Sequence, residues 1–225
     1  GFLDAVVDIY VSDTGAERPS VVGRSSKEAI ALGSSGNADL LITHEPIALY
    51  EFLTTHPEAE VTESFTSRFV IVAPPGGVFA AVDAVGYFAA IAHNGATFVS
   101  RNDGSGTHVK EQSIWSQAGI EPSEEPWYVA ASAGMGATLL IASERGATTL
   151  AELGAFLSAD DVVDLVEVDL QDSAGLENPY QATVVDPASS PGATAFQEWL
   201  ASEPGRSAIR RANLALFGFE VYEVS

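Results

Sequence analysis

A run of small polar residues, FVSRNDGSGTH at residues 98–108, has the residue types of an anion-binding loop. A short apolar strand leads into it and a helical pattern follows, and Ser105 or Thr107 is placed to cap that helix. The first backbone N–H groups of a helix have no partner within it, so they and the helix dipole favour an anion. Arg101 adds a permanent positive charge with forked donors. The alternative is an ordinary surface turn in which Arg101 forms a salt bridge with Asp103.

Two other turns join an expected strand to an expected helix through small or hydroxyl residues, at Arg24–Ser26 and Ala131–Gly136. Three such turns in one chain suggest helix N-termini that converge on a shared cleft. We therefore expect the helices after the first turn and after the loop above to face each other, with Arg101 pointing in. Plain N-capping is the alternative at the first turn. For Gly134 and Gly136, tight packing of helix on strand is favoured over close approach to a ligand.

The histidines give little support for an enzyme or a metal site. The four of them are dispersed, no HExxH pattern or comparable ligand spacing appears, and the chain has no cysteine. Ser105 and His108 lie three residues apart, which is a capping spacing, and no GxSxG elbow accompanies them. We expect His108 to orient the loop by hydrogen bonding. An enzyme that acts on a phosphate or sulfate ester through Arg101 and His108 stays open as a rival.

The charge balance of the chain limits its partners. There are 31 acidic residues against 10 lysines and arginines, which gives a formal net charge of −21. This balance argues against nucleic acid and anionic membrane surfaces as partners. The same charge repels a free anion at long range, so local donors must outweigh it. No apolar run reaches the roughly 20 residues that span a bilayer, and the first residues do not have the pattern of a signal peptide.

Apolar strands alternate with helical patterns along the 225 residues, which is typical of an α/β protein. The cluster Pro74–Gly77 is the clearest candidate boundary. We expect a first lobe over residues 1–74, a second over 75–180, and a return to the first over 181–225. Strands are expected at 20–22, 39–43, 68–73, 98–99, 127–131, 162–168 and 182–185. Helices are expected at 2–13, at 25–32, from Pro46 onward, at 82–93, at 106–117, from the turn at 134–138 to about 144, and at 149–157, 193–201 and 205–216.

The polar loop resembles the SR-x-D-x-SGTH motif of the tungstate-binding protein family, the substrate-binding components of tungstate ABC importers. Further resemblances follow in the same order along the chain. They are Val22–Ser26 with the family's VGTG turn, Gly36–Glu45 with its GDAD-apolar-VH(D/E) strand, Phe69–Val72 with FVIVGP, Trp127–Tyr128 with the WY pair, Gly134–Leu139 with GMGATL, and Asn178–Tyr180 with NPY.

This resemblance implies a two-lobed fold like that of type II periplasmic binding proteins, with a mixed sheet flanked by helices in each lobe and two crossings between the lobes. It implies a tetrahedral oxyanion held without a counter-cation, a cofactor or a metal. The residues carried over by position are Arg101 as the charged anchor, Thr107 as a donor, Ser100 and Ser105 as further donors, and Ser26 with Ser25 beside it.

The function implied is that of an extracytoplasmic, monomeric binding protein that captures tungstate, or molybdate as second choice, for the permease of an ABC importer. A lipid anchor through a preceding segment fits the same expectation. Two departures affect the pocket: VGRSSKE replaces VGTG, and the family's strand and TTTS-type loop would precede the residues that match Gly1–Asp4. An anion sensor without a transporter and a degenerate paralogue that binds nothing also stay open as rivals.

Overall fold

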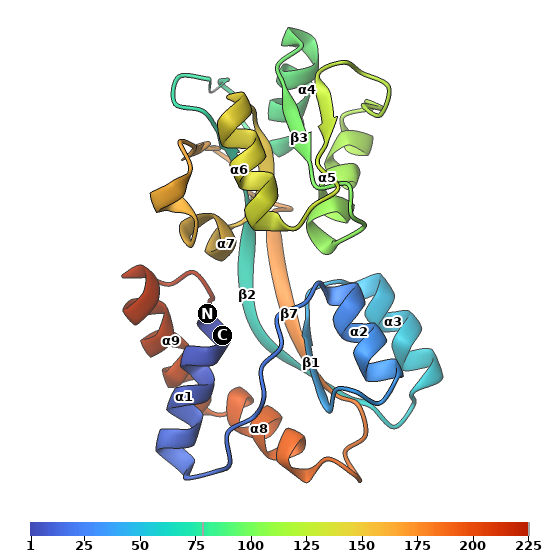
Figure 1. Cartoon of the computed structure of the whole chain (residues 1–225), viewed down its shortest axis with the longest axis vertical. Coiled ribbons are helices and arrows are strands. Elements are labelled where there is room, and N and C mark those ends of the chain that lie inside the picture. Colours follow the sequence, from blue (N-terminus) through green and yellow to red (C-terminus); the bar gives the residue numbers. More distant parts are fainter. Residues whose placement is uncertain (78, 225) are drawn as a thin grey trace. The chain divides into compact units, whose positions relative to one another are not determined.

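The computed structural model describes residues 1–77 and 79–224 (Figure 1). The chain forms two compact units. The first joins residues 1–67 to those from Asn178 onward, and the second is the continuous stretch Arg68–Glu177. The chain passes between them within strand β2 (Glu60–Ala73) and at the start of strand β7 (Glu177–Val184). The sequence placed these crossings at 74/75 and 180/181, and the Pro74–Gly77 turn lies inside the second unit.

The first unit is built on strands β1 (Leu40–Thr43), β7 and the first part of β2, which are neighbours in that order. Strand β1 pairs antiparallel with β7, with Leu41 opposite Thr183. The helices of the first unit are α1 (Phe2–Thr14), α2 (Ser26–Ser34), α3 (Pro46–Thr55), α8 (Pro191–Ala201) and α9 (Glu203–Phe217). Val6 and Tyr10, four residues apart on α1, are buried against Ile209 of α9 and Phe65 of β2.

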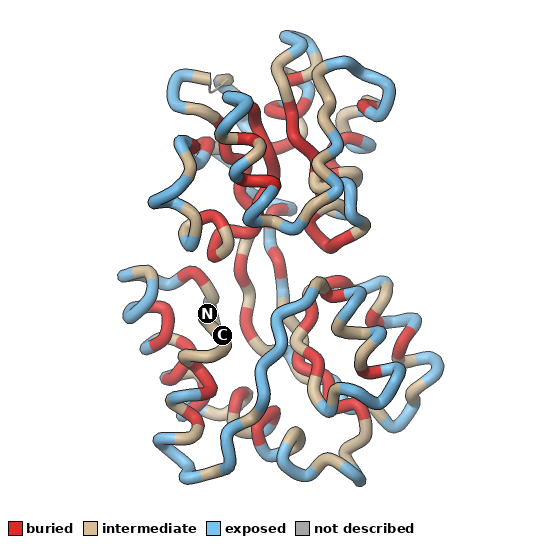
Figure 2. The backbone as a smooth tube through the Cα atoms, in the orientation of Figure 1, coloured by how far each residue is buried: buried red, intermediate tan, exposed pale blue. Residues whose placement is uncertain are grey.

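The second unit pairs the latter part of β2 with strands β5 (Thr149–Glu152) and β6 (Val166–Glu167), both antiparallel. Strands β3 (Phe98–Ser100) and β4 (Tyr128–Ala130) form a parallel pair. The helices are α4 (Ala84–Asn94), α5 (Gly106–Gln117), α6 (Met135–Arg145) and α7 (Leu153–Leu157), with a 3-10 turn at Asp160–Val162. Figure 2 shows β3 and the latter part of β2 as buried.

Aromatic side chains fill the core of the second unit. Phe88, Phe98 and Trp115 contact one another with ring centroids 4.4 to 5.3 Å apart. All three are at most 1% exposed. This packing joins α4, β3 and α5, so the strand that precedes the polar loop and the helix that follows it are both anchored in the core.

Most of the expected elements are confirmed, and five differ. The strand expected at 68–73 begins eight residues earlier, since β2 spans Glu60–Ala73. Residues 20–22 form no strand, because no neighbouring strand pairs with their backbone. Residues 149–152 are the buried strand β5, not the start of a helix, because they pair with β2. The strand expected at 162–168 is reduced to Val166–Glu167, and the last strand is longer than expected.

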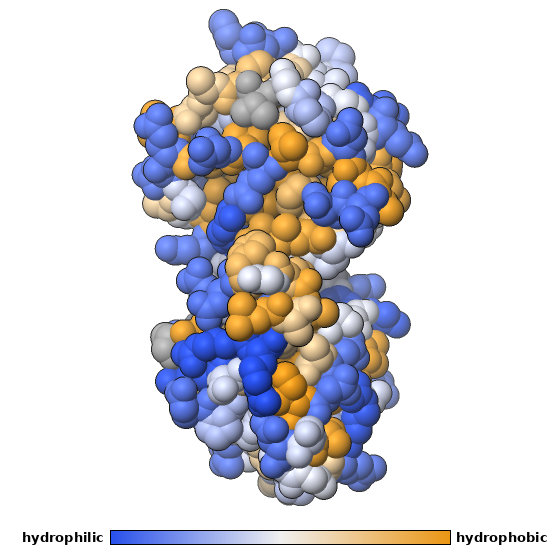
Figure 3. Space-filling view, turned by 90° about the vertical axis from the view of Figure 1, so that its left-hand side faces the viewer, coloured by the Kyte–Doolittle hydropathy of each residue, from blue (hydrophilic) through white to orange (hydrophobic). Residues whose placement is uncertain are grey.

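The surface of the described residues is mixed. On the face shown in Figure 3, apolar patches alternate with strongly hydrophilic side chains in both units. Among the described helices, none has both the length and the apolar character that crossing a bilayer requires.

Candidate anion-binding site

The loop between β3 and α5 presents unpaired backbone donors. Ser105 is the N-cap of α5, and its hydroxyl accepts the N–H of His108 at 3.4 Å. The next free amides belong to Gly106 and Thr107, which have no partner among the described residues. Because these N–H groups sit at the positive end of a 12-residue helix, they favour an anionic guest. Ser105 therefore acts as the cap, and the amides that follow it are available.

Arg101 is paired in this structure. Its Nη2 lies 2.5 Å from Asp103 Oδ2 and its Nε lies 3.1 Å away, and the two side chains are 13% and 23% exposed. The salt bridge with Asp103 that the sequence left open is therefore present. A guanidinium carries five N–H donors, of which this pair uses two, so three remain for a ligand.

Asp103 also holds the backbone of the loop. Its Oδ1 accepts the N–H of Ser105 at 3.0 Å. Burial raises the pKa of the Asp103 carboxyl, but hydrogen bonds from Ser105 and the charge of Arg101 lower it more, so its pKa lies below its usual value. Gly104 N–H donates to His108 Nδ1 at 2.9 Å. The expectation that His108 orients the loop by hydrogen bonding is thereby confirmed.

A second loop, between β4 and α6, is hydrogen-bonded to the first. Ala133 N–H donates to Arg101 O at 3.2 Å, and Asn102 Nδ2 donates to Ser132 Oγ at 3.4 Å. A Cβ atom added at Gly134 or Gly136 would meet nothing within 4 Å. The interpretation of these glycines as a tight packing contact is therefore wrong, because their missing side chains leave open space in front of α6.

The hydroxyl of Ser100 is directed toward a buried carboxylate. Its hydroxyl donates to Glu111 Oε2 at 2.7 Å and accepts the N–H of Asn102 at 3.1 Å. Glu111 is 2% exposed and also accepts from Tyr128 Oη at 2.7 Å. Burial raises the pKa of its carboxyl to about 7, although hydrogen bonds from Tyr128 and Ser100 oppose the rise.

The sequence reasoning missed Glu111, although a signal exists. Beyond its first two residues, Gly106 and Thr107, helix α5 buries Glu111, Ile114 and Trp115. A carboxylate beside the buried apolar positions of a helix needs partners inside the protein. That pattern singles out Glu111 in the printed sequence.

The first unit holds a second set of donors at the start of α2. Ser25 and Glu28 form a reciprocal capping box, so Ser25 is engaged as a cap. Ser26 Oγ, in a residue 4% exposed, accepts the N–H of His44 at 3.3 Å. His44 Nδ1 lies 2.8 Å from Oδ1 of the buried Asn178, which fixes the ring. The expectation that this helix faces the loop of the second unit stays a prediction.

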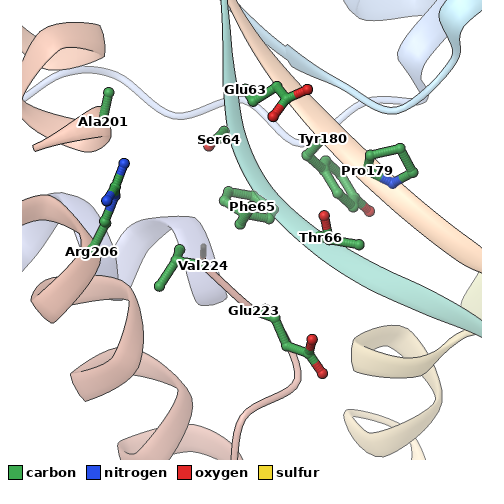
Figure 4. Close-up of a pocket in the computed structure, with 10 residues that line it drawn as sticks. All are labelled: Glu63, Ser64, Phe65, Thr66, Pro179, Tyr180, Ala201, Arg206, Glu223 and Val224. Carbon is green, nitrogen blue, oxygen red and sulfur yellow. The ribbon is translucent and has the colours of Figure 1, made fainter.

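The first unit also contains a cavity of about 170 Å³. Arg206 reaches it from α9 and Glu63 from β2, and Glu223 lies on its lower side (Figure 4). Two carboxylates and one guanidinium make it a poor host for a free dianion. Among the described residues, no group of three or more acidic or histidine side chains is arranged to hold a metal ion.

Comparison with known proteins first identifies the superfamily to which the fold belongs. A family described as "PBP superfamily domain" matches residues 1–204, which makes the fold that of the periplasmic-binding-protein superfamily. The solved structure of the tungstate-binding protein TupA from Desulfovibrio alaskensis is 31% identical and superposes with a TM-score of 0.78, covering 98% of this chain and 92% of that one. The expected type II fold is thus confirmed.

Two curated relatives narrow the class. The tungstate-binding protein TupA of Peptoclostridium acidaminophilum is 32% identical over 99% of this chain and 80% of its own length. A putative ABC transporter anion-binding protein of Haloferax volcanii is 36% identical over 93% of this chain. The chain spans 64% of the length of that second relative. By these matches the chain belongs to the tungstate-binding protein family.

Proposed function

We propose that this chain is the substrate-binding component of an ABC importer and captures a tetrahedral oxyanion, with tungstate as first choice and molybdate as second. One observation carries the proposal. In the second unit, the loop around Arg101 combines a permanently charged guanidinium with three uncommitted N–H donors and the open amides of Gly106 and Thr107.

This donor set suits an anion that is fully ionised. Arg101 and the amides can only donate, so the ligand must supply acceptors on several sides, as a tetrahedral dianion does. Thr107, which is 3% exposed, adds a hydroxyl at the second position of α5. We assign Ser100 and Ser105 to shaping the loop, since their hydroxyls are engaged with Glu111 and with the N–H of His108.

The proposed site also includes donors of the first unit. Ser26 and the amide of Lys27 open helix α2, and we assign them to the same ion, with Ser25 holding the turn. Tungstate and molybdate carry equal charge and nearly equal shape, so selection between them would rest on small differences in fit. Sulfate and phosphate are smaller and lose contacts in a site built for the larger ions.

Partners and location follow from the transporter role. The permease of an ABC importer is the proposed receiver of the ion, and the binding protein is placed outside the cytoplasm as a monomer. Attachment through a lipid anchor belongs to the same proposal. The relatives carry the names of binding proteins, and we infer a binding role in place of catalysis. Assay of wild type and His108→Ala for phosphate- and sulfate-ester hydrolysis checks this: a measurable turnover that His108→Ala abolishes would restore the enzyme alternative.

The deciding experiment is isothermal titration of the full chain, including any segment that precedes Gly1 in the gene product, with tungstate, molybdate, sulfate and phosphate. We expect one-to-one binding of tungstate and molybdate, with much weaker binding of the two smaller ions. Absence of heat with all four ions, for a sample with an intact thermal unfolding transition, would refute the proposed function.

A further inference from the structure

The buried carboxylate of Glu111 lies directly beneath the loop of the second unit. Its two oxygens accept from Ser100 Oγ and Tyr128 Oη at 2.7 Å each, and Gln112 Nε2 lies 3.3 Å from Oε1. Three donors thus point at one side chain that is 2% exposed. Nothing in the proposed function uses this group, although a buried carboxylate without a cationic partner is costly to ionise.

Two routes connect Glu111 to the anion donors. The first is a hydrogen-bond chain, because Ser100 Oγ also accepts the N–H of Asn102, the residue after Arg101. Asn102 has a φ of 46°, so this N–H helps to fix a left-handed turn in the loop. The second is distance along α5, where Glu111 follows Thr107 by four residues, or about 6 Å of helix rise. A dianion bound at the start of α5 is therefore a near neighbour of the carboxyl group.

No cation among these contacts offsets the negative charge of Glu111. Tyr128 is the titratable group that touches it, and its phenol is a neutral donor. The other titratable groups of the helix, of the loop and of the elements packed on α5 are His108 and Lys110 on α5, Arg101 and Asp103 in the loop, Tyr87 and His93 on α4, and Glu152 on β5.

Resting on the proposed function, we propose that Glu111 is a positioning residue of the oxyanion site and takes up a proton when the ion binds. A dianion disfavours a second negative charge nearby, so binding and protonation of Glu111 support each other. A protonated Glu111 donates to Ser100 Oγ, which still accepts the N–H of Asn102, so the loop keeps its geometry.

The ionisation of Glu111 sets the direction in which the affinity for tungstate changes with pH. The pKa of Glu111 in the free protein is about 7, so half of the molecules are ionised near neutral pH. If the ion raises that pKa by one unit, affinity for tungstate falls about tenfold as the pH rises from about 6 to about 9. Below this range Glu111 is already protonated and affinity no longer changes through this group.

The experiment is titration of tungstate into the full chain at several pH values, in buffers of different ionisation enthalpy, which report the protons taken up. Wild type should take up protons near pH 7.5, and Glu111→Gln should lose both the proton uptake and the tenfold slope. Glu121→Gln, which removes an exposed carboxylate of the same unit, should keep both. His108→Asn tests whether His108 causes the pH dependence instead. The asparagine keeps a side-chain acceptor for the Gly104 N–H, so this variant should retain the change of tungstate affinity with pH that we assign to Glu111.

A second variant tests the same inference if Glu111→Gln fails to fold. Tyr128→Phe removes a hydrogen bond that lowers the pKa of Glu111, so the midpoint of the pH profile should move to higher pH. A Glu111→Gln protein that retains the wild-type slope, or a Tyr128→Phe protein with an unmoved midpoint, would overturn the inference. Failure of wild type to bind any oxyanion at any pH would instead refute the proposed function.

Discussion

Replacement of Arg101 by alanine tests the proposed site most directly. The structure leaves three guanidinium N–H groups for the ion beyond the pair with Asp103. A hydrogen bond to a charged group contributes roughly 1.5–3 kcal/mol, so loss of two weakens binding by about 3–6 kcal/mol, or about two to four orders of magnitude. The carboxylate of Asp103, left without its cationic partner, adds repulsion on top of this loss.

The effect on folding should be small by comparison. The Arg101–Asp103 pair is partly exposed, and such pairs contribute about 0–1 kcal/mol to stability. For a chain of this size, Tm should fall by at most about 4 °C. Titration calorimetry with tungstate and thermal unfolding without it give the two numbers separately.

Two further variants test whether the loss of tungstate affinity is specific to Arg101. Arg68→Ala removes another arginine of the second unit, paired with Glu167 at 2.5 Å on the surface, and should leave tungstate affinity within a factor of about three. The double variant Arg101→Ala, Asp103→Asn should bind more tightly than Arg101→Ala alone, because the repulsive carboxylate is gone. Arg101→Ala that binds within about threefold of wild type would refute the reasoning, and so would one that unfolds, since Arg101 would then be a structural residue.

Three other outcomes are expected. Thr107→Val should weaken tungstate binding about tenfold through loss of one hydroxyl donor, whereas Thr107→Ser should stay near wild type in the same calorimetric titration. Ser25→Ala should lower the free energy of unfolding by about 1 kcal/mol, because the capping box with Glu28 is lost, and denaturant unfolding measures this. Association of tungstate, followed by tryptophan fluorescence in a stopped-flow instrument, should accelerate as salt rises toward about 1 M, because the net charge of −21 is screened. A rate that falls with salt would mean that the local positive field of the loop dominates.

Much of the fold could be predicted because local signals agree with tertiary structure. Gly15 adopts a φ of 69° and ends α1, and Pro46 begins α3, as their residue types indicate. Strand β5 could not be found in this way, because Thr149 and Thr148 suit a strand while the following Leu153–Leu157 is helical. Only pairing with β2, some 80 residues earlier in the chain, decides between the two.

The candidate site, too, could be predicted from the sequence only in part. The backbone donors at α5 follow from capping rules, so Ser105 could be assigned a position from the sequence. The direction of the Ser100 hydroxyl could not, because its partner Glu111 lies eleven residues away and on another element. The pairing of Arg101 with Asp103 was open from the sequence, since both an ion-binding and a self-paired loop use the same residues.

The division of the chain between its units has a consequence for synthesis on the ribosome. Residues 68–177 are continuous, so this part can assemble as soon as it emerges. The other unit cannot, because Val6 and Tyr10 pack against Phe196 and Ile209, which are translated much later. During that interval the apolar face of α1 is open to chaperones and to aggregation, and the segment from α8 to α9 closes it once translated.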